Sequence, residues 1–140
     1  MAIKTYEEFL KFSLQVVQKF IQKNNLTLKY GVQNGKMFDF DEATVPEIDK
    51  HLYYIIGQNH KLFYIRFQKY DSDVYNLFLD NSEISLILDQ NMNRLTSYPN
   101  EELNSRIDKI KGSIEEKLTT CLYMLWDISC FIVFLGSEPS

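Results

Sequence analysis

The sequence predicts one α+β domain: an N-terminal helix, an antiparallel meander of four to six strands, and a long apolar C-terminal helix packed on one sheet face. A chain of 140 residues, 45% hydrophobic and 24% charged, suits a single domain over residues 1–140. Apolar residues recur at helical spacing near both ends of the chain and alternate with polar residues between them. This change of period, from 3.6 to 2, predicts helices at the ends and strands in the middle.

The first helix is predicted over residues 6–24. Thr5 and Glu8 have the spacing of a capping box, which satisfies backbone donors at a helix start. The apolar residues behind them fall mostly on one helical face: Phe9, Leu10, Phe12, Val16, Val17, Phe20 and Ile21. We expect the helix to end at Asn24 and Asn25, because asparagine tolerates the left-handed conformation.

Three hairpins are predicted after this helix. The first joins residues 26–32 to 36–40 through Asn34-Gly35, a dipeptide typical of tight hairpin turns. The second joins 51–56 to 61–69, and the third joins 73–79 to 83–88. A competing interpretation continues residues 84–95 as a helix. In the strand over 61–69, we expect Phe63, Ile65 and Phe67 to face the core and the other face to be semi-polar.

The C-terminal region keeps a helical apolar phase from Leu103 to Ile132. It predicts one kinked helix or two consecutive helices over 101–134, with Gly112 as the interruption and Ser113 and Glu116 capping a start near Ile114. Residues 118–135 could instead form a β-hairpin or a membrane anchor. A membrane anchor is disfavoured because Asp127 would lie mid-bilayer and no cation follows, so we expect no membrane association.

The end of this helix is apolar on every side, through residues such as Phe131, Ile132, Phe134 and Leu135. A segment of this kind is enclosed by its own fold or covered by another subunit. We therefore expect these residues to contact either the sheet of the same chain or a second copy in a homodimer.

Charge is distributed unevenly along the chain. Residues 70–108 hold two cations, Arg94 and Arg106, among eight acids, whereas residues 1–69 carry more cations than acids. An acidic balance disfavours nucleic acid and favours a protein partner with a basic surface. The candidate partner-binding residues on this acidic segment are Asp71, Asp73, Asp80, Glu83, Asp89, Glu101 and Glu102.

No motif for catalysis, a cofactor or a metal stands out. The five glycines form no phosphate-binding loop, and there is no GxSxG elbow. In the second predicted hairpin, counting residues outward from the turn pairs Gly57 with His60 and places His51 opposite Arg66. The two histidines are therefore not expected to form a metal site. Cys121 and Cys130 would face opposite sides of one helix and are expected to be free thiols. Because no secretory signal is seen, we expect a cytoplasmic protein. Because no catalytic motif is found, we expect that it is not an enzyme.

The order helix, hairpins, helix resembles small secretion chaperones and bacterial toxin-immunity proteins in architecture alone, without a shared residue motif. The leading hypothesis is a non-enzymatic protein-binding module, such as an inhibitor, immunity protein or chaperone-like adaptor, that uses the acidic surface of residues 70–108. The alternative is a carrier for a small apolar ligand, bound between the sheet and the C-terminal helix. Its pocket would be lined by residues such as Tyr30, Tyr53, Phe63 and Phe67.

Overall fold

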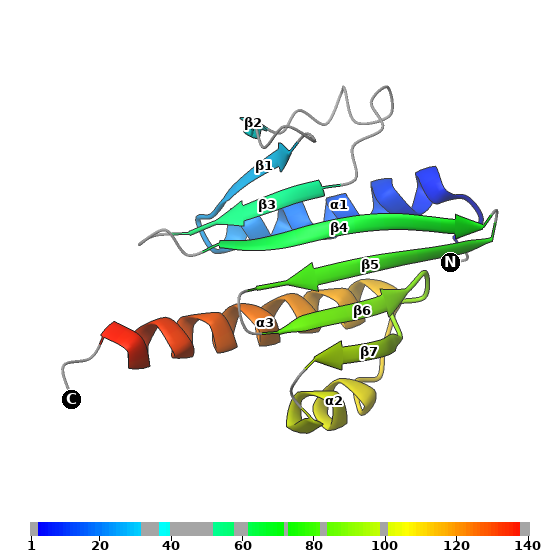
Figure 1. The fold of residues 1–140 in the computed structure, drawn as a ribbon. Helices are drawn as coiled ribbons and strands as arrows, with labels where there is room; N and C mark the ends of the chain where they lie inside the picture. Colours follow the sequence, from blue (N-terminus) through cyan, green and yellow to red (C-terminus); the bar gives the residue numbers. More distant parts are fainter. Residues whose placement is uncertain are drawn as a thin grey trace.

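The computed structural model describes residues 3–31, 37–39, 52–57, 62–71, 73–81, 84–98 and 101–137. Over these residues it confirms the predicted α+β fold, with an N-terminal helix, an antiparallel sheet and a C-terminal helix (Figure 1). The elements are α1 (Tyr6–Lys23), β1 (Thr27–Gly31), β2 (Met37–Asp39), β3 (Leu52–Ile56), β4 (Leu62–Asp71), β5 (Val74–Asp80), β6 (Ser85–Asp89), β7 (Arg94–Tyr98), α2 (Glu101–Asp108) and α3 (Ile114–Ser137).

The described strands form one sheet in the order β2-β1-β3-β4-β5-β6-β7, and every neighbouring pair is antiparallel. The three predicted hairpins are present as the pairs β1–β2, β3–β4 and β5–β6, although the Asn34-Gly35 turn lies outside the described residues. The seventh strand, β7, was not predicted. It pairs with β6, so the helical interpretation of residues 84–95 is wrong.

The second hairpin has a register one residue away from the expected one. Leu52, rather than His51, lies opposite Arg66, and Ile56 lies opposite Leu62. A connection longer by one residue than the turn assumed from the sequence accounts for the shift, because register follows loop length. His51 and His60 themselves lie outside the described residues.

Both long helices begin at the predicted caps. The Thr5 hydroxyl accepts a hydrogen bond from the Glu8 N–H at 3.1 Å, and the Ser113 hydroxyl accepts one from the Glu116 N–H at 3.1 Å. Between α2 and α3, Gly112 has φ +133°, a left-handed conformation that interrupts the helical path. The C-terminal region is thus two helices, and the continuous helix α3 rules out a β-hairpin over residues 118–135.

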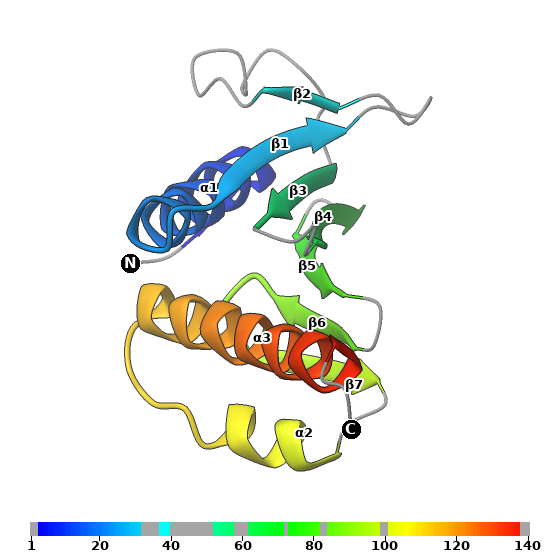
Figure 2. The same ribbon diagram turned by 90° about the vertical axis from the view of Figure 1, so that its left-hand side faces the viewer.

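The helices α1 and α3 cover the same face of the sheet, and α2 lies beside β7 (Figure 2). Side chains on this inner face alternate with outward ones along each strand. The fully buried inner residues of β3 to β6 are Tyr53, Ile55, Ile65, Phe67, Leu77, Leu79, Leu86 and Leu88. The predicted core side of β4 is therefore confirmed at Ile65 and Phe67, whereas the Phe63 side chain lies outside the described part.

An aromatic cluster joins α1 to the middle of the sheet. The Phe9 ring, fully buried, meets the Phe67 ring edge-on with centroids 5.8 Å apart and stacks on Tyr75 at 5.9 Å. Tyr53 meets Phe67 edge-on at 5.8 Å. Edge-on and offset contacts of this kind add to the stabilisation from burial, so one helix residue contacts two strands directly and a third through Phe67.

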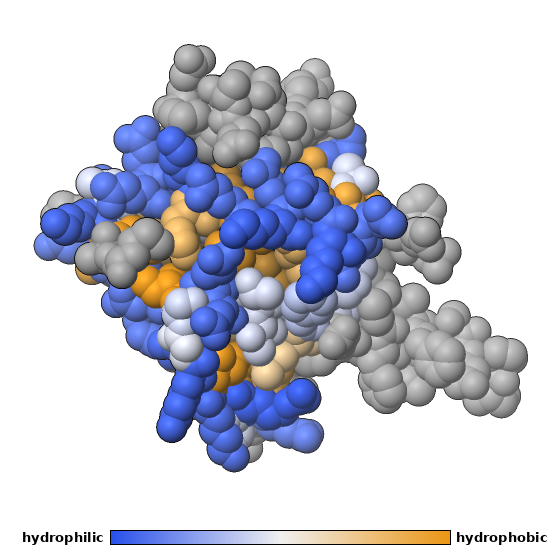
Figure 3. All heavy atoms as spheres, turned by 180° about the vertical axis from the view of Figure 1, so that it is seen from behind, coloured by the Kyte–Doolittle hydropathy of each residue, from blue (hydrophilic) through white to orange (hydrophobic). Residues whose placement is uncertain are grey.

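The two covering helices also contact each other. The Phe20 ring meets the Tyr123 ring edge-on at 4.9 Å, and the Asn24 side-chain amide donates to the Tyr123 hydroxyl at 3.2 Å. At the solvent side, the Lys19 ammonium lies 2.6 Å from the Glu115 carboxylate. Seen from behind, mostly hydrophilic residues face the solvent over these helices, with hydrophobic ones between them (Figure 3).

The side chains of residues 127–137 lie outside the described part of the structure. The predictions for Phe131, Ile132, Phe134 and Leu135, and for Asp127 and Cys130, fall on these side chains. Among the residues searched, no helix combines the length and hydropathy needed to cross a bilayer.

Gly57 provides the first testable prediction, because it lies where β3 meets Trp126 of α3. A Cβ atom at position 57 would lie 2.5 Å from Trp126 Cη2 and 2.9 Å from Cζ2, closer than van der Waals contact allows. We expect Gly57→Ala to lower the free energy of unfolding by about 1–3 kcal/mol through overpacking, measured by urea denaturation.

The double variant G57A/W126F provides the control, because the smaller ring leaves room for the added methyl group. We expect it to be less destabilised than the sum of the two single variants. Additive effects would show that the indole and residue 57 do not meet.

Candidate functional site

The face of the sheet opposite α1 and α3 carries no helix among the described elements (Figure 2). We call its central residues the open face: Tyr54, Tyr64, Arg66, Phe78 and Ile87. Strand register brings them together, since Tyr54 lies opposite Tyr64, and Arg66, Phe78 and Ile87 lie side by side on β4, β5 and β6. Each alternates with a buried inner residue of its own strand.

Two contacts organise the open face. The Tyr54 and Tyr64 rings meet edge-on with centroids 5.0 Å apart, and the Arg66 guanidinium lies 4.1 Å above the Phe78 ring. The arginine thus shields Phe78, which is 7% exposed, while Tyr64 is 36% exposed. The surface is amphipathic and partly aromatic, as the predicted semi-polar side of β4 implied. Its continuation onto Phe78 and Ile87 was missed, because residues 77–79 and 86–88 are apolar runs in which no alternation marks the outward residue.

Asp80 and Asp89 lie at opposite ends of the β5–β6 pair, on the same side of the sheet as the open face. The Asp80 carboxylate accepts a hydrogen bond from the Ser85 hydroxyl. The Asp89 carboxylate accepts from the backbone N–H groups of Asn91 at 2.8 Å and Asn93 at 2.9 Å, which fixes the β6–β7 turn. Both carboxylates therefore have local structural partners as well as a place beside the open face.

The remaining predicted acidic residues are divided among three places. Asp71 and Asp73 are exposed where β4 turns into β5, and the Gln90 side chain donates to the Asp73 carbonyl at 2.8 Å, which brings them to the Asp89 end. Glu102 is exposed on α2. Glu83 and the side chain of Glu101 lie outside the described residues. The acids near Asp89 are separated from Asp80 by the length of a five-residue strand, about 17 Å.

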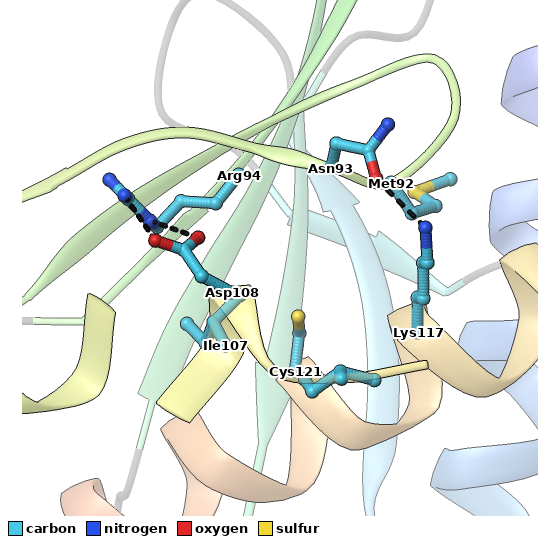
Figure 4. A pocket seen from close by; sticks show the side chains of 8 residues that line it. Met92, Asn93, Arg94, Ile107, Asp108, Lys117 and Cys121 are labelled. Atoms are coloured by element: carbon cyan, nitrogen blue, oxygen red, sulfur yellow. Dashed lines mark hydrogen bonds and ion pairs between the residues drawn. The ribbon is translucent and has the colours of Figure 1, made fainter. Parts of the chain in front are cut away.

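A small pocket of about 110 Å³ lies between the β6–β7 turn, α2 and α3 (Figure 4). Arg94 donates two hydrogen bonds to the Asp108 carboxylate, at 2.8 and 2.7 Å. Lys117 donates to the Asn93 side-chain oxygen at 2.8 Å. The lining residues are Met92, Asn93, Arg94, Ile107, Asp108, Ile110, Lys117 and Cys121. These polar groups already engage one another, and the volume is below that of typical ligand pockets.

Cys121 contributes the thiol among the described residues that line this pocket, and the thiol points into it (Figure 4). It is fully buried, and burial raises the pKa of the thiol to about 12. Because the thiolate is the reactive and metal-binding form, this cysteine is inert near neutral pH. Within the described part of the chain, no group of three or more His, Cys, Asp or Glu residues could hold a metal ion.

The aromatic residues expected to line a carrier pocket pack against other side chains. Tyr53 and Phe67 are almost fully buried and in contact with each other and, through Phe67, with Phe9. Tyr30 is half-buried against the same core, and the Phe63 side chain lies outside the described residues. The helix residue that covers Phe67 is Phe9 of α1, so these contacts fill the space under α1, whereas the predicted pocket was under the C-terminal helix.

The buried thiol gives the second prediction. At pH 8, iodoacetamide should modify Cys121 about a hundredfold or more slowly in the native protein than in guanidinium, because the raised pKa and the burial both suppress thiolate attack. Mass spectrometry of the peptide that contains Cys121 follows this residue separately from Cys130. Equal native and denatured rates would contradict the assignment.

The ion pair at the pocket gives the third prediction. The hydrogen bonds from Arg94 hold the pKa of Asp108 below its ordinary value of 3.8 in the folded state. The unfolded chain therefore takes up this proton first, and the stabilisation present above about pH 5 is lost as the pH falls through the folded pKa. We expect the free energy of unfolding of Asp108→Asn to fall less steeply than that of the wild type below pH 5.

The exposed Glu102 on the same helix serves as the control for this measurement. Glu102→Gln removes a carboxylate from α2 without touching the ion pair with Arg94, so its pH profile should follow the wild type. If the free energy of unfolding falls equally steeply below pH 5 in Asp108→Asn and in the wild type, the ion pair between Arg94 and Asp108 does not stabilise the fold.

Comparison with known proteins identifies no relative on which to test this geometry. No family model matches the chain. No curated protein and no solved structure matches it either. The features that bear on function are therefore the open face, the carboxylates at its margins and the packed rings of Tyr53 and Phe67.

Proposed function

We propose that this protein is a non-enzymatic protein-binding module whose partner, presenting a basic surface, docks on the open face and its acidic margins. The class includes inhibitors, immunity proteins and chaperone-like adaptors. The single observation that carries the proposal is the sheet face without a helix among the described elements, where the exposed Tyr64 ring packs on Tyr54 and lies opposite Asp80. Aromatic residues and arginine, which form the centre of this face, are enriched in protein interfaces relative to the rest of the surface.

Charge supports a basic partner. Asp71, Asp73 and Asp89 gather at one end of the β5–β6 region, and Asp80 lies at the other. Arg94, a cation of the neighbouring strand, is already paired with Asp108 and does not neutralise them. Complementary charges of this kind steer association and select partners, even where they add little affinity.

In the small pocket, the polar side chains are bonded to one another and the thiol is buried with a raised pKa, so the described residues there lend little support to catalysis. A carrier function has less support, because two of its expected lining residues, Tyr53 and Phe67, pack against each other. Native mass spectrometry distinguishes these functions. If an apolar molecule is found bound to the purified protein, the carrier function is supported and the binding module is not.

The fourth prediction tests the open face directly. A photo-crosslinking amino acid at Tyr64 or Ile87 should capture the same polypeptide from a lysate of the source cells, and the yield should fall in high salt. The same amino acid at Gln15, exposed on α1, is the matched control. Equal capture from Gln15 and the open-face positions would contradict the proposal.

Charge reversal completes this test. Asp73→Lys should lower the crosslinking yield from Ile87, because it replaces an exposed acid at the margin by a cation. Glu7→Lys makes the same charge change on the solvent side of α1 and should leave the yield unchanged. A captured polypeptide identical to this chain would identify the face as a homodimer interface instead.

A further inference from the structure

Strand β4 is longer than the neighbour that pairs with its first half. β3 pairs with Leu62–Arg66 only, whereas β5 pairs with β4 from Tyr64 through Asp71. Residues 67–70 of β4, which we call the β4 overhang, therefore have a strand on one side only, among the described residues. In Figure 1 the overhang is the part of β4 that runs past the start of β3 toward the β4–β5 turn.

A groove of about 350 Å³ runs along this position. Its lining in the described part of the chain consists of four consecutive residues, Arg66, Phe67, Gln68 and Lys69. Successive residues of a strand point to opposite faces, so a groove that touches four in a row follows the edge of the strand and not one face. Alternate residues of an edge strand turn their N–H and C=O groups away from the paired neighbour, where an added strand would bond them.

The charge at the overhang selects what can pair there. Arg66 and Lys69 are exposed and Gln68 is neutral, so the groove itself is cationic, and the exposed Asp71 lies just beyond it at the end of β4. A second copy of this chain pairing through the same edge would bring these two cations against their own counterparts. Like charges on neighbouring strands destabilise pairing, whereas carboxylates on the incoming strand would stabilise it.

We propose that the β4 overhang binds an extended acidic segment of a partner protein, which adds to the sheet as a short strand beside β4. Four residues span about 13 Å, so a segment of five to seven residues is long enough. Backbone hydrogen bonds provide affinity in this mode, and side chains provide selectivity. A lysine and an irregular register, as found between Lys69 and Asp71, are features that protect strand edges against self-association. A carboxylate on the incoming strand would pair with the Lys69 ammonium.

The probe is a fluorescent, capped heptapeptide of valine and threonine with two central glutamates, and its twin carries two central lysines. We expect the glutamate peptide to bind the full chain at least tenfold more tightly than the lysine peptide by fluorescence anisotropy. In ¹⁵N NMR spectra, the amide shifts should centre on residues 67–70. Lys69→Glu should weaken the glutamate peptide about tenfold or more, whereas Lys11→Glu, on the exposed side of α1, should not change its affinity.

Three results would overturn the inference: equal binding of both peptides, amide shifts centred away from β4, or no binding of the glutamate peptide at millimolar concentration. The circular dichroism of Lys69→Glu, compared with Lys11→Glu, shows whether the fold is intact. This site shares Arg66 with the open face, but the two experiments read different positions, because the peptide probes the strand edge and the crosslinker probes Tyr64 and Ile87. Failure of one experiment therefore leaves the other proposal standing.

Discussion

The fold depends on covering one face of the antiparallel sheet with helices. Phe9 makes the central contact, since its ring meets Phe67 and Tyr75 while Tyr53 closes on Phe67 from β3. Burial of these rings removes a large apolar area from water, at roughly 25 cal/mol for each Å². Burial among them also raises the pKa of the Tyr53 hydroxyl, which stays protonated. Phe20 of α1 then helps to position α3, because its ring meets the Tyr123 ring of that helix edge-on.

Two helices cover one face of the sheet, and among the described elements no helix covers the other face. The chain meets this constraint by making the outward residues amphipathic: Arg66 covers Phe78, and Tyr64 packs against Tyr54. An uncovered face built only of aliphatic residues would invite aggregation. The sequence predicts this character for β4 alone, and the observed register extends it over the four strands β3 to β6. The open face is thus a property of the assembled sheet.

Local signals predicted most of the fold, because caps and alternation act within a few residues. Thr5 and Ser113 start their helices as expected. The missed strand β7 has no such signal, since it holds Arg94, Thr96 and Ser97 and is specified by pairing with β6 and by contact with α2. The acidic residues were identified by composition, but only register and turns decide which end of the sheet each occupies. Sequence position alone carries no such information.

The position of Arg66 constrains how any basic partner could bind. Its guanidinium lies at the centre of the open face, where it would repel an incoming cation, whereas Asp80 and Asp89 lie toward the two ends. A partner must therefore place its cations at the margins and an apolar surface at the centre. The contact of Arg66 with Phe78 contributes only about 0.5–1 kcal/mol at an exposed site, so docking could displace it. The same arginine borders the β4 overhang, where it would attract carboxylates instead. One residue thereby separates two surfaces of opposite preference.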